Sequence, residues 1–323
     1  MADAAARYGD AVAYRSGVGT GDQQLSFGEL AAAAARGASQ LQMLDIDNVV
    51  VADGGSIALP IAIFASVGAS VPVAPVDPSL HPDDQRHLLE SLDLPLLIGG
   101  DDARQAISGL PDVASALLQE FVGGIGSALA RDEPEMASTP TVAPDLAEVL
   151  LQLVRRSPEG MGVKPFAGSC LDDALRFNEA MAPLRAPGLT LVARESHDAA
   201  TVVALLRSLH TGEPVSVTPD RGRALHRRLV ETGVTHLEIS SDRLPGLVRA
   251  AQRGDITELA SVVVGDAPLP PALLFEAAEA LDVDVETAFG LVDFGIGVLQ
   301  SSVSEMGGLD RLRPGERLSL IHI

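Results

Sequence analysis

The sequence predicts an α/β protein built on mostly parallel sheets, and three observations support this. Apolar runs that are short and β-branched alternate with Ala-rich helical segments along most of the 323 residues. Hydrophobic residues make up 46% of the chain, whereas aromatic residues make up 3% and tryptophan is absent. A core of Ala, Val, Leu and Ile suits parallel strands that helices cover on both faces. The chain is also long enough for two α/β subdomains.

The first part of the chain, residues 1–144, is expected to form the first subdomain. Ser26 and Glu29 form a capping pattern that begins an Ala-rich helix running to about Leu41. Further helices are expected at 57–68 and 84–91, and strands at 48–52, 70–75 and 94–98. The stretch 131–144 is polar and contains proline, which is typical of a linker or surface loop.

Residues 145–316 are expected to form the second α/β subdomain. Strands are predicted at 189–193, 214–217, 235–239 and 261–264, and helices at 199–209, 221–232, 244–253 and 271–281. Residues 283–300 follow as a stretch that carries sequence motifs. The alternation of strands and helices predicts parallel pairing in this half as well.

One uncharged segment is long enough to cross a bilayer. Residues 57–76 contain no charged side chain over 20 positions. They include Pro60, Pro72 and Pro75, and they lack basic flanks and an aromatic belt. A buried helix followed by a buried strand is therefore the preferred interpretation, and no integral membrane segment is expected.

Charge and cysteine content restrict the possible partners and compartment. Acidic residues outnumber basic ones 44 to 23, giving a net charge of −21 that disfavours nucleic acids and anionic lipid surfaces. Cys170 is the only cysteine, so no internal disulfide can form. Together with an N-terminus that lacks an apolar signal-peptide stretch, this predicts a cytoplasmic protein.

Five short segments occur in an order that is informative in combination. They are Leu25–Leu30 (LSFGEL), Val67–Pro78 (VGASVPVAPVDP), Val234–Leu237 (VTHL), Val262–Pro271 (VVVGDAPLPP) and Glu286–Asp293 (ETAFGLVD). Each is weak alone, but their order and spacing across the chain resemble one family. That family is the AMP-forming synthetase and ligase superfamily, which includes acyl-CoA synthetases, peptide-synthetase adenylation domains and luciferases.

The resemblance implies a fold, a reaction and cofactors. The fold would be the N-terminal domain of these enzymes, with two packed α/β subdomains. The reaction would join a small-molecule carboxylate to ATP, giving an acyl-adenylate and pyrophosphate, and a thiol, usually that of CoA, would then take the acyl group. The implied cofactors are therefore ATP, Mg²⁺ and CoA.

The stretch 156–165 (RSPEGMGVKP) corresponds to the family's phosphate-binding loop. It keeps Ser157, Gly160, Gly162 and Lys164, the only lysine of the chain, as implied ATP-binding residues. Pro158 removes a backbone donor and Glu159 adds a carboxylate, and neither favours phosphate binding. A surface turn is the alternative interpretation.

Two further motifs correspond to the family's adenine site. Gly265, Asp266, Ala267 and Pro268 form the first, and Phe289, Gly290, Leu291 and Val292 form the second. Phe289 would stack on the base, and Asp293 would reach Mg²⁺. Asp266 replaces a usual glycine and Val292 a usual threonine. The alternative is that Phe289 is a core aromatic residue and Asp293 a helix N-cap.

His197 is the implied catalytic residue, because it matches a histidine near the family's acyl pocket. A purely structural histidine between a strand and a helix is the alternative. The other histidines show no spacing typical of metal ligands.

The C-terminal end of the sequence is unusual. Residues 307–316 resemble the start of the family's β-rich continuation, and residues 317–323 resemble translated adaptor DNA. We therefore expect a non-native tail at 317–323 and a truncated gene. The implied ribose-binding Asp and the lysine of the lid domain would then be missing.

The leading functional hypothesis is an ATP-dependent acyl-adenylating enzyme. The alternative is an inactive homologue that binds a nucleotide or an acyl ligand, or that acts as an interaction module. An α/β oxidoreductase is a third hypothesis, but no GxGxxG fingerprint follows the first strand.

Overall fold

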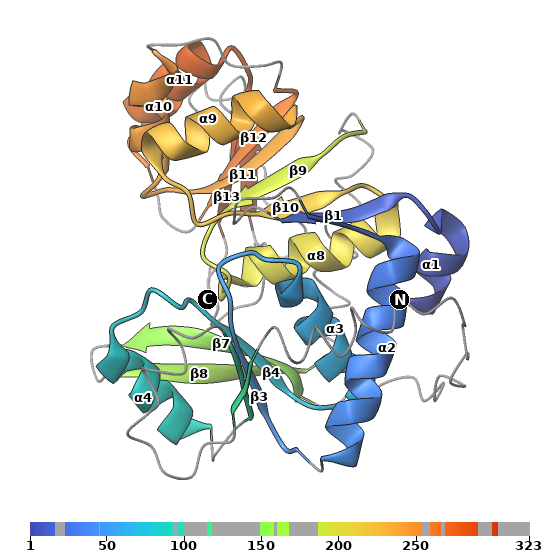
Figure 1. The fold of residues 1–323 in the computed structure, drawn as a ribbon. Coiled ribbons are helices and arrows are strands. Elements are labelled where there is room, and N and C mark those ends of the chain that lie inside the picture. Colours follow the sequence, from blue (N-terminus) through green and yellow to red (C-terminus); the bar gives the residue numbers. More distant parts are fainter. Residues whose placement is uncertain are drawn as a thin grey trace. The chain divides into compact units, whose positions relative to one another are not determined.

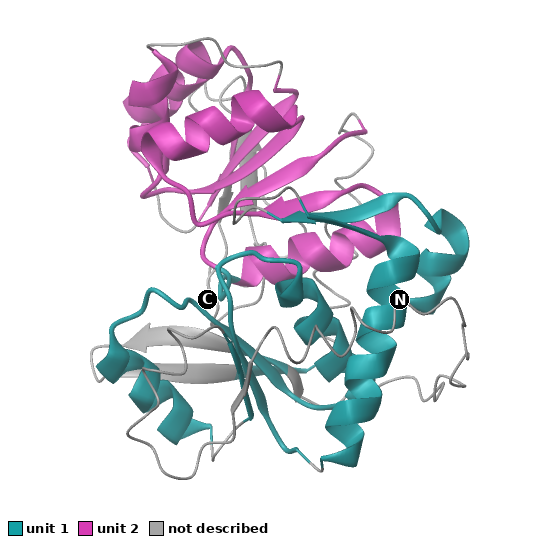
Figure 2. Ribbon diagram, viewed as in Figure 1, with its two compact units in different colours: residues 1–171, 196–198 teal, residues 172–195, 199–323 magenta. Residues whose placement is uncertain are grey.

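The computed structural model describes eleven stretches of the chain, which together form two compact units (Figure 2). These stretches are residues 1–16, 23–44, 46–92, 96–99, 115–117, 149–157, 160–167, 187–252, 259–265, 269–289 and 299–302. Unit 1 comprises residues 1–171 and 196–198, and unit 2 comprises residues 172–195 and 199–323. Both units are α/β with mostly parallel strands (Figure 1), which confirms the predicted fold class.

Unit 1 contains a six-stranded sheet. Its strands are β3 (Val49–Ala52), β4 (Val73–Val76), β5 (Leu96–Gly99), β6 (Ser115–Leu117), β7 (Val149–Ser157) and β8 (Gly160–Ala167). Their order in the sheet is β6-β5-β3-β4-β7-β8. Only the β7–β8 pair is antiparallel. At the N-terminus, a short helix α1 (Ala2–Tyr8) precedes the antiparallel pair β1 (Val12–Ser16) and β2 (Gln24–Ser26).

The main helices of unit 1 follow from local sequence signals. Helix α2 (Phe27–Met43) begins at a capping box, in which Glu29 N donates to Ser26 Oγ at 3.1 Å and Ser26 N donates to Glu29 Oε2 at 2.8 Å. Helix α4 (Pro82–Ser91) buries Leu88 and Leu89 against strands β3 and β4.

Helix α3 (Ala58–Ala69) settles the nature of the uncharged segment. Its residues 58 to 66 are all buried, and strand β4 follows it with four buried residues. A helix that is apolar on all sides is expected in a protein core. Within the described residues, no helix is long and apolar enough to cross a membrane.

Unit 2 contains a second, mostly parallel sheet. Its strands are β9 (Thr190–Ala193), β10 (Val215–Val217), β11 (His236–Ser240), β12 (Ser261–Gly265), β13 (Val285–Phe289) and β14 (Leu299–Ser302), in the order β14-β13-β12-β11-β9-β10. The β13–β14 pair is antiparallel, whereas β10–β9, β9–β11, β11–β12 and β12–β13 are parallel pairs.

Alternating strand residues build the core of unit 2. Leu237 and Ile239 of β11 join Val262 and Val264 of β12 in one apolar cluster. This cluster includes side chains from α9 (Gly222–Thr232), α10 (Leu244–Ala251) and α11 (Pro271–Leu281). Helix α8 (Ala199–Thr211) connects β9 to β10 in the chain.

The predicted elements recur with small shifts at their ends, but three features differ from the expectations. Helix α1, the β1–β2 pair and the β7–β8 pair were not expected. The hairpin also affects the division of the chain, because β7 pairs with β4 and thereby belongs to unit 1 rather than to a second subdomain starting at residue 145. Residues 131–144 and 307–323 lie outside the described residues.

Candidate functional site

Polar and charged side chains gather where the parallel strands of unit 2 end. Arg194 and Glu195 follow β9, Thr218 follows β10, and Asp242 and Arg243 come just after β11. Ligands of open parallel sheets bind outside the carboxyl ends of the strands. This carboxyl edge is therefore the candidate site.

Glu195 is held by two arginines at this edge. Its Oε1 lies 2.7 Å from Nη2 of Arg221 and 2.7 Å from Nη2 of Arg243. The Arg243 side chain has 0% of its surface exposed, and its Nη1 donates to the carbonyl of Thr218 at 2.9 Å. Because a buried charge is costly unless it is paired, removing Glu195 would leave Arg243 poorly compensated.

Asp242 extends this network towards solvent. Its carboxylate accepts hydrogen bonds from Arg221 Nη1 at 2.6 Å and from Ser240 Oγ at 2.6 Å. Burial alone would raise the pKa of Asp242, but the hydrogen bonds from Ser240 and Arg221 and the charges of Arg221 and Arg243 lower that pKa below its usual value. Burial opposes the charge of Arg221, yet Asp242 and Glu195 raise its pKa overall, so both partners stay charged.

Arg194 lies across the strand ends. It follows β9, whereas its guanidinium reaches Gly265, the last residue of β12. A Cβ atom on Gly265 would lie 2.9 Å from Cζ of Arg194 and closer still to Nη2. Strand β11 lies between β9 and β12 in the sheet, so the side chain spans the end of β11. Arg194 is only 4% exposed.

The structure also brings two predicted adenine-site residues to this edge. Strands β12 and β13 are adjacent and parallel, with Val264 opposite Thr287. Gly265 and Phe289 end these two strands, so they lie at the same edge of the sheet. Asp266, Ala267 and Pro268, and likewise Gly290, Leu291, Val292 and Asp293, lie outside the described residues.

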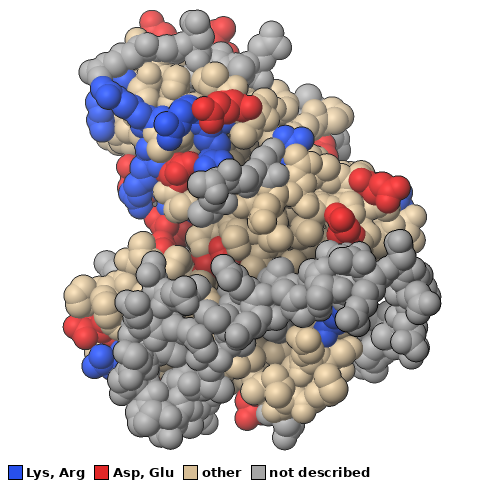
Figure 3. Space-filling view, in the orientation of Figure 1, with Lys and Arg blue, Asp and Glu red and all other residues tan. Residues whose placement is uncertain are grey.

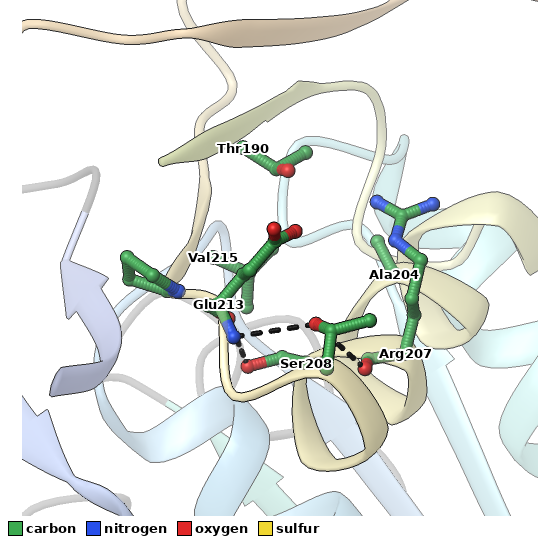
Figure 4. A pocket seen from close by; sticks show the side chains of 8 residues that line it. Thr190, Ala204, Arg207, Ser208, Glu213 and Val215 are labelled. Carbon is green, nitrogen blue, oxygen red and sulfur yellow. Dashed lines mark hydrogen bonds between the residues drawn. The ribbon is translucent and has the colours of Figure 1, made fainter. Parts of the chain in front are cut away.

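The opposite edge of the same sheet carries a shallow hollow beside the starts of β9 and β10. Thr190, Arg207, Glu213 and Val215 are among its lining residues (Figure 4). Ser208 Oγ donates to the carbonyl of Glu213 at 2.6 Å. This hydrogen bond joins the last turns of α8 to the segment that leads into β10. The hollow encloses no room for a water molecule, so it is a poor candidate for a ligand site.

The stretch expected as a phosphate loop is mostly paired strand. Ser157 pairs with Gly160 in register, Arg155 with Gly162, and Leu153 with Lys164. Only residues 158 and 159 lie between the two strands in the chain. These residues therefore form a hairpin in unit 1, in which the apolar run 149–154 extends the first sheet. The phosphate-binding role of Ser157, Gly160, Gly162 and Lys164 stays a prediction.

A comparison with protein families assigns the first part of the chain. The model of the AMP-binding enzyme family matches residues 1–154. This matched region covers most of unit 1, and the resemblance from short motifs reaches into unit 2. The first part of the chain is therefore similar to AMP-binding enzymes.

Several solved structures share the fold of this chain. The luciferase-like enzyme from the nonluminescent Zophobas morio mealworm has a TM-score of 0.77 at 14% identity, over 95% of this chain and 74% of that one. VinN in complex with L-aspartate gives 0.79 at 16% identity, over 90% and 74% of the two chains.

A third structure is o-succinylbenzoate CoA synthetase from Bacillus subtilis with the acyl-adenylate intermediate OSB-AMP. It gives a TM-score of 0.78 at 16% identity, over 97% of this chain and 63% of that chain. At such low identity these likenesses describe the fold. No curated protein sequence matches the chain.

His197 lies between β9 and α8. It belongs to unit 1, where the neighbouring Ser196 Oγ donates to the carbonyl of Val76 at 3.3 Å. Val76 ends β4, whose sequence carries one of the family-like segments. The location of His197 at a strand-to-helix junction agrees with the sequence, and its acyl-pocket role stays a prediction.

Sequence reasoning missed the charged residues of the carboxyl edge, above all Arg194, Glu195 and Arg243. A signal was present, because Arg194 and Glu195 follow directly on an apolar strand. Asp293, the implied Mg²⁺ ligand, lies outside the described residues. Among the residues that the structure describes, no group of three or more His, Cys, Asp or Glu could hold a metal ion.

Proposed function

We propose that this protein is an acyl-adenylating enzyme. In the first step a carboxylate oxygen of the substrate attacks the α-phosphorus of ATP. The bond between the α-phosphorus and the bridging oxygen breaks, and pyrophosphate leaves with that oxygen. In the second step a thiol, proposed to be that of CoA, attacks the acyl carbonyl and loses its proton, and AMP leaves.

The observation that carries the proposal is the position of Gly265 and Phe289. They lie side by side at the carboxyl edge of a parallel sheet, where nucleotides bind in such folds. Glycine allows a ligand to approach the backbone, and an aromatic ring offers a stacking face. In unit 1, Lys164 supplies a positive charge suited to a phosphate.

The other predicted site residues have supporting roles in the proposal. Ser157, Gly160 and Gly162 would contact phosphates with the hairpin backbone and a hydroxyl group. Asp266, Ala267, Pro268, Gly290, Leu291 and Val292 would surround the adenine, and Asp293 would hold Mg²⁺. His197 would line the acyl pocket. We propose a cytoplasmic location, in keeping with the single cysteine.

An inactive homologue that binds a nucleotide or acyl ligand is the second candidate. Two observations favour it. The hairpin 149–167 has its backbone paired along most of the expected phosphate loop. The sequence of that stretch also contains the acidic residue Glu159. Such a protein would bind AMP without exchanging pyrophosphate.

Carboxylate-dependent ATP–pyrophosphate exchange distinguishes the two candidates. With a panel of acyl substrates, we expect exchange that falls at least tenfold in Phe289→Ala because the stacking face is lost. Phe275→Ala, on the exposed face of α11 where the side chain is 47% exposed, is the matched control and should retain exchange. A folded wild-type chain that exchanges with no carboxylate would refute the enzyme proposal.

A further inference from the structure

Arg194 is a buried cation at the edge of the sheet where the ligands of the proposed reaction would bind. Arg194 is only 4% exposed. Arginine is rarely buried to this extent unless its charge is paired, because removing that charge from water is costly. Arg194 is thus a buried cation at the carboxyl ends of the strands, where the ligands of open parallel sheets bind.

The neighbour of Arg194 is suited to this placement. Gly265 has no side chain, and any Cβ atom there would collide with the guanidinium. The two residues come from strands that are not adjacent, β9 and β12, so their fit is a tertiary feature. The absence of a side chain at Gly265 leaves room for the guanidinium of Arg194 at the end of β12.

The segment that carries Arg194 is held firmly. The carbonyl of the next residue, Glu195, accepts a hydrogen bond from Thr201 Oγ1 at 2.8 Å. The carboxylate of Glu195 is bound to Arg221 and Arg243. Because these contacts fix the backbone beside Arg194, little ordering is needed when a ligand arrives.

The chemistry of the guanidinium indicates the class of ligand. It is a planar fork with five N–H donors, which matches the two oxygens of a carboxylate or phosphate. Both reactants of the proposed adenylation are oxyanions. Five donors also allow an anion to bind while other contacts of Arg194 persist.

We propose that Arg194 binds an oxyanion of the reactants at the carboxyl edge of unit 2. The oxyanion is either a carboxylate of the acyl substrate or a phosphate of the nucleotide. The identity of these ligands rests on the proposed function. Arg194 is then a binding residue that contributes to substrate choice, a role that no motif of the sequence indicates.

The test is calorimetric titration of the full chain with four probes: AMP, inorganic pyrophosphate, hexanoate and adipate. Arg194→Gln should weaken binding of one class roughly ten- to hundred-fold, as is typical for loss of a charge-assisted hydrogen bond. Arg194→Lys should recover part of the affinity. Weaker binding of AMP and pyrophosphate identifies the ligand of Arg194 as a phosphate. Weaker binding of both hexanoate and adipate identifies it as the reacting carboxylate, and weaker binding of adipate alone identifies it as a second carboxylate of the substrate.

Arg249→Gln provides the matched control. Arg249 is exposed in the last turn of α10, and arginines gather over α9 and α10 on the outer surface of unit 2 (Figure 3). The control removes the same charge from the same unit, at the end of a helix that leads to the start of β12 rather than at the carboxyl ends of the strands. It should leave the affinity for all four probes unchanged.

A second variant keeps the test decisive if Arg194→Gln fails to fold. Gly265→Ala retains every charge, but its methyl group would displace the guanidinium from the strand end. It should weaken binding of the same class of probe. For a phosphate, pyrophosphate rather than AMP is the deciding probe, because Gly265 also belongs to the proposed adenine site. Circular dichroism of each variant establishes that the fold is retained.

Three results would overturn the inference. One is that the folded Arg194→Gln variant binds every probe as tightly as the wild type, which would make Arg194 structural. Another is tighter binding, which would mean that the side chain fills the site, and the third is that the wild type binds none of the probes. If binding depends on Arg194 but the wild type shows no pyrophosphate exchange, only the enzyme proposal is refuted. If the wild type exchanges pyrophosphate and the Arg194→Gln variant exchanges it equally well, only the inference is refuted.

Discussion

Arg194 and Gly265 illustrate at the residue scale how a site can depend on a pair that no local pattern connects. Gly265 could be named as a candidate site residue from the sequence, because it lies in a family-like motif after a buried strand. Arg194 could not, because a charge after an apolar strand usually turns to solvent. Its burial depends on the strand order, which sequence spacing does not specify.

The close fit of this pair predicts a coupling in stability. Gly265→Ala should lower the free energy of unfolding by about 1–3 kcal/mol, because the methyl group overpacks the guanidinium. In an Arg194→Ala background the same change should cost much less, and urea unfolding of the four proteins measures the difference. Equal costs in both backgrounds would show that the two residues do not contact one another.

Asp242 predicts a specific response to acid. Its pKa is lower in the folded chain than in the unfolded chain, so the unfolded state binds more protons as the pH falls towards the usual aspartate value. Its contribution is present above that value and is lost as pH falls through the folded pKa.

Asp242→Asn should therefore make unfolding free energy less dependent on pH below about pH 4. The Asp242 side chain is 56% exposed, so the effect should be below about 1 kcal/mol and should weaken in high salt. Denaturant unfolding at several pH values measures it. If the unfolding free energy of the variant depends on pH as strongly as that of the wild type, the pKa of Asp242 is the same in the folded and the unfolded chain.

At the element scale, helix α2 shows what the sequence predicts well. Its start follows from a capping box, and the structure contains both hydrogen bonds of that box. Most other helices and strands were predictable for the same reason, because caps and apolar periodicity are local. The β7–β8 hairpin was not, because pairing of β7 with β4 joins residues far apart in the chain.

The capping box gives a prediction with a control in the same helix. Ser26→Ala should cost about 1 kcal/mol of unfolding free energy, because the backbone N–H of Glu29 loses its acceptor. Ser39→Ala should cost less, since Ser39 lies inside the helix and donates only to the carbonyl of Ala35. Thermal unfolding of both variants checks this. Equal costs would assign the stability of α2 to packing rather than to its cap.

At the scale of the whole molecule, the chain consists of two compact α/β units. The sequence predicted two subdomains and the adenylate-forming fold, because strand–helix alternation and family-like motifs extend along the chain. It did not predict the division, since the hairpin completes the first sheet instead of beginning the second. The distribution of charges at the carboxyl edge of unit 2 likewise depends on tertiary structure.

The central claim is that the carboxyl edge of unit 2 binds the adenylate. Amide hydrogen exchange with and without AMP tests it most directly. Exchange should slow in peptides that contain the ends of β12 and β13, at Gly265 and Phe289, and stay unchanged in those that contain the start of β10. Slowing at the start of β10 alone, or no change in any peptide at saturating AMP, would contradict the claim.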